Sequence, residues 1–356
     1  MQMDRMLLAT ISALAMCGCV VAWQDLPPPD VWKVRQGTDR AYRTARWNQT
    51  NWLEMDAPAD RDRVARAGLD LLYGVSEIPQ MPAVPNEWTG ASGGVRLDTV
   101  SEFRRGYRSL RTYLASAGEV TRSAPLQEIE IQVKLFPSPQ QAMDYLRNPP
   151  RGYSAGAVPV GAPAPTYNSG LPSGARMGEV FVVSQPVPQS KSITFVLGRA
   201  MVYVQVQGYE AVSLDYLEAL AWGVAYRVLH HSELLPSHVK PAGAEGNALL
   251  DGVEVAPLSL LRRAGCSLET KRPVQRWSIR VIVPLEEAVN RQISGEALAD
   301  WRVRVQWGQR WVELEAFSWQ MKTWDGRQVQ LSRPAFPYRG DLVAPLQEVK
   351  QALGIQ

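Results

Sequence analysis

Histidine and carboxylate side chains gather at one point of this sequence, at His230, His231, Glu233 and His238. Imidazole nitrogens and carboxylate oxygens are common ligands of zinc, so a metal site is one interpretation. Neighbouring residues of an α-helix point about 100° apart, and Pro236 separates His238 from the others, so these side chains would not converge on one ion. The pattern favours a polar helix end, where histidine also suits the helix dipole. We therefore predict no metal ligands here.

Motifs typical of enzymes are not found in the rest of the chain. No glycine-rich phosphate loop follows a predicted strand, the Gly-x-Ser-x-Gly motif is absent, and no motif pairs the carboxylates. Cys266 follows an apolar stretch and has no histidine close in sequence, which favours a packed thiol over a nucleophile. We predict no catalytic residue and no cofactor. The alternative is an envelope hydrolase with a site in residues 96–237, beside a glycine- and proline-rich loop at 148–176.

Tryptophan offers a different chemistry, because an exposed indole ring marks a binding surface and can stack on a sugar. The chain has 12 Trp against 6 Phe. In the alternating segment 301–315, Trp311 shares its strand face with glutamates and is expected to be exposed. Trp307 shares a face with Val303 and Val305 and is expected in the core. The candidate glycan-binding surface comprises Trp311, Trp319 and Trp324.

Arginines accompany an apolar stripe in residues 98–114. Apolar residues recur there every three or four positions, at Val100, Phe103, Tyr107, Leu110 and Leu114. This spacing predicts an amphipathic helix, whose other sides would carry Arg104, Arg105, Arg108 and Arg111. Arg104, Arg108 and Arg111 form a second candidate surface, for anionic lipid or a wall polymer; the competing interpretation is a solvated helix face. The net charge of +3 is small and indicates no nucleic-acid partner.

The first residues suggest export. An apolar run at 6–16 has the length of a signal-peptide core and is too short to span a bilayer. It ends at Gly18-Cys19, which resembles the lipobox of bacterial lipoproteins. The resemblance implies a signal peptide at 1–18, acylation of Cys19 and a lipid anchor in the cell envelope, facing the periplasm or exterior. Cys17 is the other candidate for acylation. A buried N-terminal helix, simple secretion and an uncleaved anchor remain as alternatives.

The remaining chain divides into a tether and two domains. Residues 19–95 read as a tether with one short helix at 59–73 and an irregular segment. After the helix at 98–114, the domain at 96–237 has an alternating strand at 129–136 and a helix that begins at Ser138-Pro139 with a capping box. It continues with strands at 179–184, 192–197 and 200–207 and closes with an apolar helix at 213–230.

A near-repeat marks the second domain, at 247–356. The tetrapeptide Val-Ala-Pro-Leu occurs at 255–258 and again at 343–346, and glycine follows at Gly265 and Gly354. Each copy predicts a short strand that runs into a helix ending at glycine. Between the copies, Gly308-Gln309 and Asp325-Gly326 suit hairpin turns.

This arrangement resembles the copper amine oxidase N-terminal-like domain. Val303, Val305, Gly308, Val312 and Leu314 match its strand pair. The turn and helix that follow are matched by Gly340, Leu342, Val343, Pro345, Leu346, Ala352, Leu353 and Gly354. The resemblance covers roughly the last 110 residues and implies an accessory envelope module without a copper site.

The sequence as a whole predicts an α+β protein. Two small α+β domains, built of antiparallel sheets with packed helices, would follow the lipoprotein leader and tether. The expected function is that of a non-catalytic envelope lipoprotein that acts as a binding or scaffold component. Its expected partners are the membrane, through the lipid anchor, and either cell-wall glycan or an envelope protein.

Overall fold

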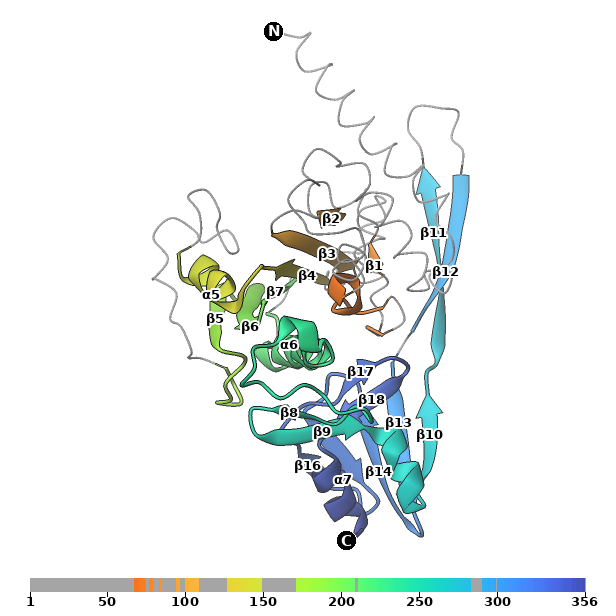
Figure 1. The fold of residues 1–356 in the computed structure, drawn as a ribbon. Helices are drawn as coiled ribbons and strands as arrows, with labels where there is room; N and C mark the ends of the chain where they lie inside the picture. Colours follow the sequence, from red (N-terminus) through yellow and green to blue (C-terminus); the bar gives the residue numbers. More distant parts are fainter. Residues whose placement is uncertain are drawn as a thin grey trace.

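The chain has an α+β fold in which antiparallel sheets pack against a few helices (Figure 1). The computed structural model describes residues 67–74, 77–79, 83–84, 94–96, 100–108, 127–148, 171–208, 211–282, 290–298 and 300–355. The predicted leader and most of the tether, including Cys17 and Cys19, lie outside these residues. Within the described ranges, no helix combines the length and the apolar character needed to cross a membrane.

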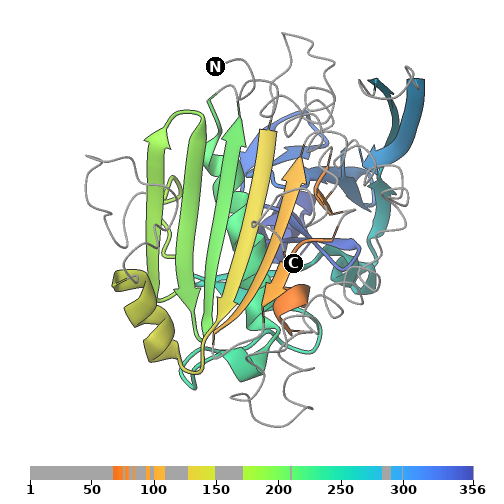
Figure 2. The same ribbon diagram turned by 90° about the horizontal axis from the view of Figure 1, so that it is seen from above.

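A seven-stranded antiparallel sheet forms the first layer, in the order β1-β3-β4-β7-β6-β5 with β2 paired to β3 (Figure 2). Its strands are β1 (Ala83–Val84), β2 (Gly94–Arg96), β3 (Ser101–Arg108), β4 (Gln127–Leu135), β5 (Val180–Val187), β6 (Ser190–Leu197) and β7 (Ala200–Gly208). The strands predicted at 129–136, 179–184, 192–197 and 200–207 are thereby confirmed.

The helix predicted over residues 98–114 is wrong, because residues 101–108 form β3 and pair with β4 along their whole length. Phe103 and Tyr107 are both fully buried, and a spacing of four places two residues on one side of a helix and also on one face of a strand. Arg105 stands between them and donates to the Tyr73 carbonyl at 2.6 Å. Arg105 lies on the same strand face as Phe103 and Tyr107. It interrupts the alternation of apolar and polar residues that would have indicated a strand.

Helices α5 (Pro139–Arg147) and α6 (Leu214–Leu229) confirm two predicted helices. Ser138 caps α5 and Ser213 caps α6, each by accepting a hydrogen bond from a backbone amide of the first turn. Every residue of α6 from Leu217 to Leu229 is buried, which is typical of a helix enclosed on all sides. Of the helix predicted over 59–73, residues 67–70 are helical and 59–66 lie outside the described residues.

The second half of the chain forms two further sheets. One has the order β17-β18-β9-β8, from β8 (Ala248–Leu250), β9 (Val253–Pro257), β17 (Phe336–Tyr338) and β18 (Asp341–Ala344). The other has the order β10-β13-β14-β15-β16, from β10 (Ser267–Lys271), β13 (Arg302–Trp307), β14 (Arg310–Glu315), β15 (Gln320–Thr323) and β16 (Gln328–Gln330). Gly308 and Gly326 take positive φ in the two predicted hairpin turns.

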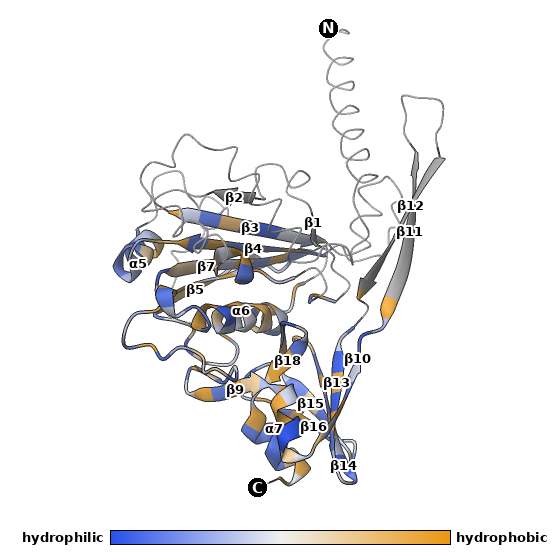
Figure 3. Ribbon diagram, turned by 45° about the vertical axis from the view of Figure 1, so that its right-hand side comes forward, coloured by the Kyte–Doolittle hydropathy of each residue, from blue (hydrophilic) through white to orange (hydrophobic). Residues whose placement is uncertain are grey.

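The two copies of the near-repeat lie against each other. Ala256 of β9 pairs with Ala344 of β18 in an antiparallel ladder, so the copies are related by an approximate local two-fold. The first strand leads into the 3-10 helix η6 (Leu258–Ala264), where an α-helix was expected, and the second into the α-helix α7 (Leu346–Leu353). Gly265 and Gly354 end these helices in the left-handed region, as predicted. In Figure 3, α7 carries both hydrophobic and hydrophilic residues, as suits a helix with one buried face.

A two-stranded ribbon extends away from the body. Strands β11 (Val274–Ile282) and β12 (Asn290–Leu298) pair with each other along nine residue pairs and continue the directions of β10 and β13 (Figures 1 and 3). The two ladders are separated on this side by Arg272-Pro273, which belong to neither strand. The guanidinium of Arg272 lies 3.9 Å from the centre of the buried Trp301 ring.

Most buried side chains belong to one continuous core. It runs from the seven-stranded sheet through α6 to the sheets of the second half. Helix α6 contacts β6 and β7 on one side and β8 and β17 on the other, so it lies between the two halves of the protein (Figure 1). A smaller apolar cluster lies beneath α5, on the opposite face of the seven-stranded sheet.

Candidate functional site

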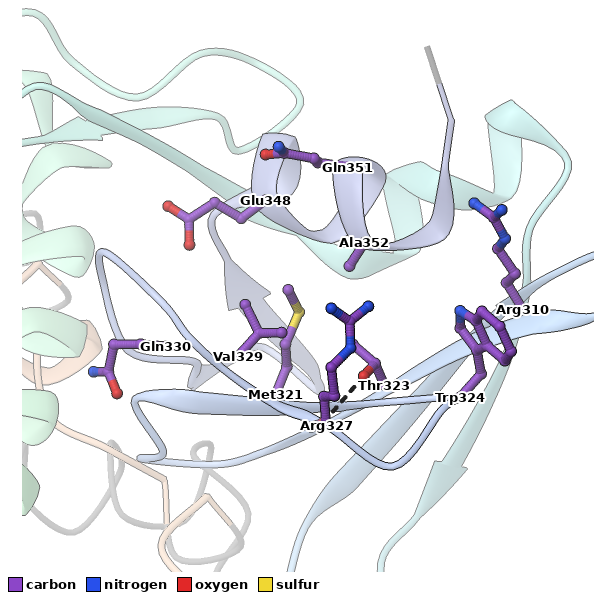
Figure 4. Close-up of a pocket in the computed structure, with 10 residues that line it drawn as sticks. All are labelled: Arg310, Met321, Thr323, Trp324, Arg327, Val329, Gln330, Glu348, Gln351 and Ala352. Carbon is purple, nitrogen blue, oxygen red and sulfur yellow. Dashed lines mark hydrogen bonds between the residues drawn. The ribbon is translucent and has the colours of Figure 1, made fainter.

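A cavity of about 450 Å³ opens between α7 and the β14–β16 part of the five-stranded sheet (Figure 4). The sheet side supplies an apolar floor of Met321 and Val329, with Thr323 and Gln330 beside it. The helix side supplies Glu348, Gln351 and Ala352. The remaining lining residues are Arg310, Trp324 and Arg327. This cavity joins an apolar surface to long polar side chains, a combination typical of ligand sites.

The turn between β15 and β16 builds one wall of the cavity. Its backbone is closed by hydrogen bonds from the Gly326 amide to the Thr323 carbonyl and from the Thr323 amide to the Arg327 carbonyl, both of 2.9 Å. Gly326 has φ of 82°, a conformation that glycine adopts without strain. Within this turn, residues 323–327 bring an aromatic ring, a carboxylate and a guanidinium together.

Asp325 organises the polar groups of the turn. The Thr323 hydroxyl donates to its Oδ1 at 2.6 Å, and Arg327 donates through Nε to its Oδ2, also at 2.6 Å. The hydrogen bond from Thr323, followed by the contacts with Arg327, lowers the pKa of the Asp325 carboxyl. Asp325 is therefore ionised near neutral pH and fixes the direction of the Arg327 side chain.

Trp324 stands at the mouth of the cavity with 46% of its surface exposed. The Arg310 guanidinium lies 5.9 Å from the centre of its ring, and Figure 4 shows the two side chains next to each other. Gly354, at the end of α7, leaves room for Arg310, because a Cβ atom at that position would collide with the guanidinium. The indole therefore offers an open flat face in a position set by its surroundings.

Helix α7 contributes the opposite wall. Glu348 accepts hydrogen bonds from the Ser332 amide, at 3.0 Å, and from the Ser332 hydroxyl. Gln351 lies one turn of helix away and is exposed. A flat aromatic ring beside amide, carboxylate and guanidinium groups can stack on a sugar ring and hydrogen-bond its hydroxyls.

The three tryptophans of the predicted surface do not come together. Only Trp324 lines the cavity. Trp311 lies on the other face of β14, with the Arg304 guanidinium 4.4 Å from its ring centre. Trp319 packs against the main core and donates from Nε1 to the Asp215 carbonyl at 2.8 Å.

The expected burial of Trp307 is wrong, since 41% of its surface is exposed. Val303 and Val305 on the same strand face are buried as expected. Trp307 pairs with Arg310 across the hairpin, at the last position before the turn. The core that covers Val303 and Val305 does not extend to this end of the strand, so the face that carries Trp307 is open to solvent.

The arginine surface predicted on a helix does not form as expected, because Arg104 and Arg108 belong to strand β3. Arg104 forms ion pairs with Glu130 at 2.6 Å and Glu102 at 3.7 Å. Its charge is thus balanced within the sheet face. Nothing is described of the Arg108 side chain, and Arg111 lies outside the described residues, as does Cys19.

The three histidines each have a different environment. His230 Nδ1 lies 3.0 Å from the Tyr226 carbonyl, His231 contacts Asp70 and Glu233, and His238 lies 3.6 Å from Glu179. Among the residues that the structure describes, no group of three histidine, cysteine or acidic side chains is placed to hold a metal ion. Cys266 is buried as a free thiol, and burial raises its pKa.

The long loop predicted at 148–176 is described only at its ends, at residue 148 and from residue 171 onward. Ser173 is hydrogen-bonded through its amide and hydroxyl to Glu218 of α6, and Trp222 donates from Nε1 to the same carboxylate at 3.0 Å. Burial raises the pKa of Glu218, against the effect of these hydrogen bonds. These contacts fasten the outgoing end of the loop to α6.

Four polar residues of the cavity had no signal in the sequence as a site: Arg310, Arg327, Glu348 and Gln351. They come from two successive hairpins and from the helix α7 that follows them, and no local motif of the sequence links the three segments. The turn Thr323-Trp-Asp-Gly-Arg327 was the available clue, because it concentrates aromatic and charged residues around a recognisable turn dipeptide.

Comparisons of the chain with models of known protein families, with curated proteins and with solved structures found no match.

Proposed function

We propose that this protein is a non-catalytic, lipid-anchored component of the cell envelope that binds glycan at the cavity beside Trp324. The observation that carries the proposal is the exposed indole of Trp324 at the edge of a cavity of about 450 Å³. The polar groups around it are hydrogen-bond donors and acceptors on both walls, as sugar hydroxyls require. Anchoring rests on the leader, in which an apolar run ends at Gly18-Cys19.

Removal of the Trp324 ring tests the glycan site. The full chain in detergent micelles would be titrated with chitotetraose, with tryptophan fluorescence and calorimetry as readouts. Ring contacts of an aromatic side chain are worth about 0.5–1.5 kcal/mol beyond the area they bury, so Trp324→Ala should weaken binding about two- to tenfold. Trp307→Ala is the matched control, because Trp307 is similarly exposed on the same sheet but does not line the cavity. Equal affinity of Trp324→Ala and wild type would refute the site.

The address is tested separately. Cys19→Ala should move the protein out of the membrane fraction and abolish incorporation of labelled palmitate, whereas Cys266→Ala should leave both unchanged because Cys266 is buried in the fold. Cys17→Ala decides between the two leader cysteines. Membrane retention of Cys19→Ala without loss of label would exclude acylation at this position.

A further inference from the structure

The Arg327 side chain is fixed at one edge and open at the other. Its Nε donates to Asp325 Oδ2 at 2.6 Å, and 74% of the side chain is exposed. Among the described residues, no other acidic group pairs with Arg327 and its terminal Nη groups donate to none of them. A guanidinium bound through Nε keeps the edge formed by its terminal amino groups for another acceptor.

Two guanidinium groups, those of Arg310 and Arg327, and one carboxylate, that of Glu348, line the cavity. Asp325 lies outside the lining and pairs with the Nε edge of Arg327. Both oxygens of Glu348 are already occupied by Ser332. Arg310 forms no ion pair among the described residues and lies against Trp324. An anion that enters the cavity therefore meets two guanidinium groups, and the hydrogen bonds from Ser332 hold the Glu348 carboxylate in place without cancelling its charge.

Trp324 and Arg327 place an aromatic ring and an open guanidinium edge in the same cavity. They are three residues apart in one turn. In Figure 4 the Arg327 guanidinium points from the turn toward α7, and the Trp324 ring lies farther along the cavity, next to Arg310. A sugar stacked on the indole would place its substituents within reach of the guanidinium. Arginine binds a carboxylate through two parallel hydrogen bonds and thereby selects for its planar shape.

We propose that the ligand is a glycan whose sugar units carry a carboxylate, and that Arg327 is the residue that selects for it. This inference rests on the proposed glycan function. Asp325 acts as a positioning residue, because it accepts the hydrogen bond from Arg327 Nε and leaves the terminal amino groups of the guanidinium open. Thr323 positions Asp325 in turn, by donating its hydroxyl to Oδ1.

Three tetrasaccharides of equal length test the selection: neutral chitotetraose, an N-acetylglucosamine–N-acetylmuramic acid tetramer with lactyl carboxylates, and tetragalacturonate with ring carboxylates. The full chain in micelles would be titrated with each, at low and high salt. A hydrogen bond to a charged group contributes about 1.5 kcal/mol or more, so at least one acidic tetramer should bind about tenfold tighter than chitotetraose. The preferred acidic tetramer identifies the source of the carboxylate.

Arg327→Gln should remove the preference for the acidic sugar, and its loss of affinity for the preferred acidic tetramer should exceed its loss of affinity for chitotetraose about tenfold. Asp325→Asn should reduce the preference in part, and Arg263→Gln, an exposed arginine paired with Glu245 elsewhere on the surface, should leave it intact. Equal binding of neutral and acidic tetramers by the wild type would overturn the carboxylate inference while supporting a glycan site. Failure of all three tetramers to bind would overturn the proposed function and this inference with it.

Discussion

Arg227 is a buried charge of α6, with 3% of its side chain exposed. Its Nη2 pairs with Glu77 at 2.8 Å and also donates to the Pro337 carbonyl, and Nη1 donates to the Asp70 carbonyl. Glu77 in turn accepts hydrogen bonds from the amides of Gly74 and Arg339. A buried charge is tolerated when its hydrogen bonds are made within the protein. This cluster thereby joins Asp70, Gly74 and Glu77 to α6 and to β17.

The rim of the same cluster contains an ion pair that titrates. His231 lies 3.2 Å from Asp70 and 3.3 Å from Glu233, and Arg339 and Arg227 also face Asp70. Burial would lower the pKa of His231, but the hydrogen bond and charge of Asp70, with Glu233, raise it above its usual 6.5. Burial likewise opposes ionisation of Asp70, but the bond from His231 and the two arginines lower its pKa to about 2.

The directions of these two pKa shifts predict how the contribution of His231 to stability depends on pH. A raised histidine pKa stabilises the fold below about pH 6.5 and loses its effect as pH rises through the raised value. A lowered Asp70 pKa stabilises it above about pH 4 and is lost as pH falls toward 2. His231→Gln should therefore reduce the free energy of unfolding more at pH 5 than at pH 8, as measured by urea denaturation. A larger loss at pH 8 would contradict the ion pair between His231 and Asp70. Burial lowers the pKa of the neighbouring His230, but this residue is present in both the wild type and the variant, so its titration does not account for a difference between them.

At the scale of elements, α6 depends on a close approach at Gly223. A Cβ there would collide with the Tyr73 hydroxyl and lie 2.9 Å from Tyr73 Cζ and 3.3 Å from Phe336 Cβ. Gly to Ala within a helix normally gains about 1 kcal/mol from propensity, whereas forced overpacking costs about 1–3 kcal/mol. Gly223→Ala should therefore lower the free energy of unfolding, by up to about 2 kcal/mol. Tyr73→Phe in the same protein removes the atom of closest contact and should restore part of that loss; a gain in stability from Gly223→Ala alone would show that α6 is packed less tightly.

Elements governed by local rules could be predicted from the sequence. Helix α5 begins where Ser138 and Pro139 indicate, because a cap involves only residues of the first turn. Helix α6 follows from its continuous apolar pattern. Strand β3 could not be recognised, since Arg105 occupies the buried face only by virtue of a carbonyl acceptor at Tyr73, distant in sequence.

The site shows the same limit. Trp324 could be proposed as a binding residue because exposed tryptophan is informative by itself. The roles of Arg327 and Gln351 depend on α7 lying against the β15–β16 hairpin, and nothing in the local sequence of either segment indicates that contact. Trp311 was proposed from strand parity and is on the outer face, but the cavity is on the inner one.

At the scale of the whole molecule, the core continues across the boundary between the two predicted domains, 96–237 and 247–356. Val202 of β7, Tyr226 of α6 and Leu342 of β18 belong to one buried cluster. Buried apolar surface stabilises all elements that share it, so the two halves are expected to unfold together. The sheets within the predicted ranges 96–237 and 247–356 share one hydrophobic core. Helix α6 lies in this core and contacts strands of both halves.

Leu342→Ala tests this cooperation, because Leu342 is fully buried in β18, in the half away from the seven-stranded sheet. Loss of a buried leucine costs about 2–5 kcal/mol. Hydrogen exchange should show the same loss of protection for the slowest amides of β4 and of β14, since a shared core makes global unfolding their common route of exchange. Ser259→Ala, at an exposed position of η6, should leave both sets unchanged. If Leu342→Ala accelerated exchange in β14 while β4 kept its full protection, the halves would be independent units and α6 would merely lie between them.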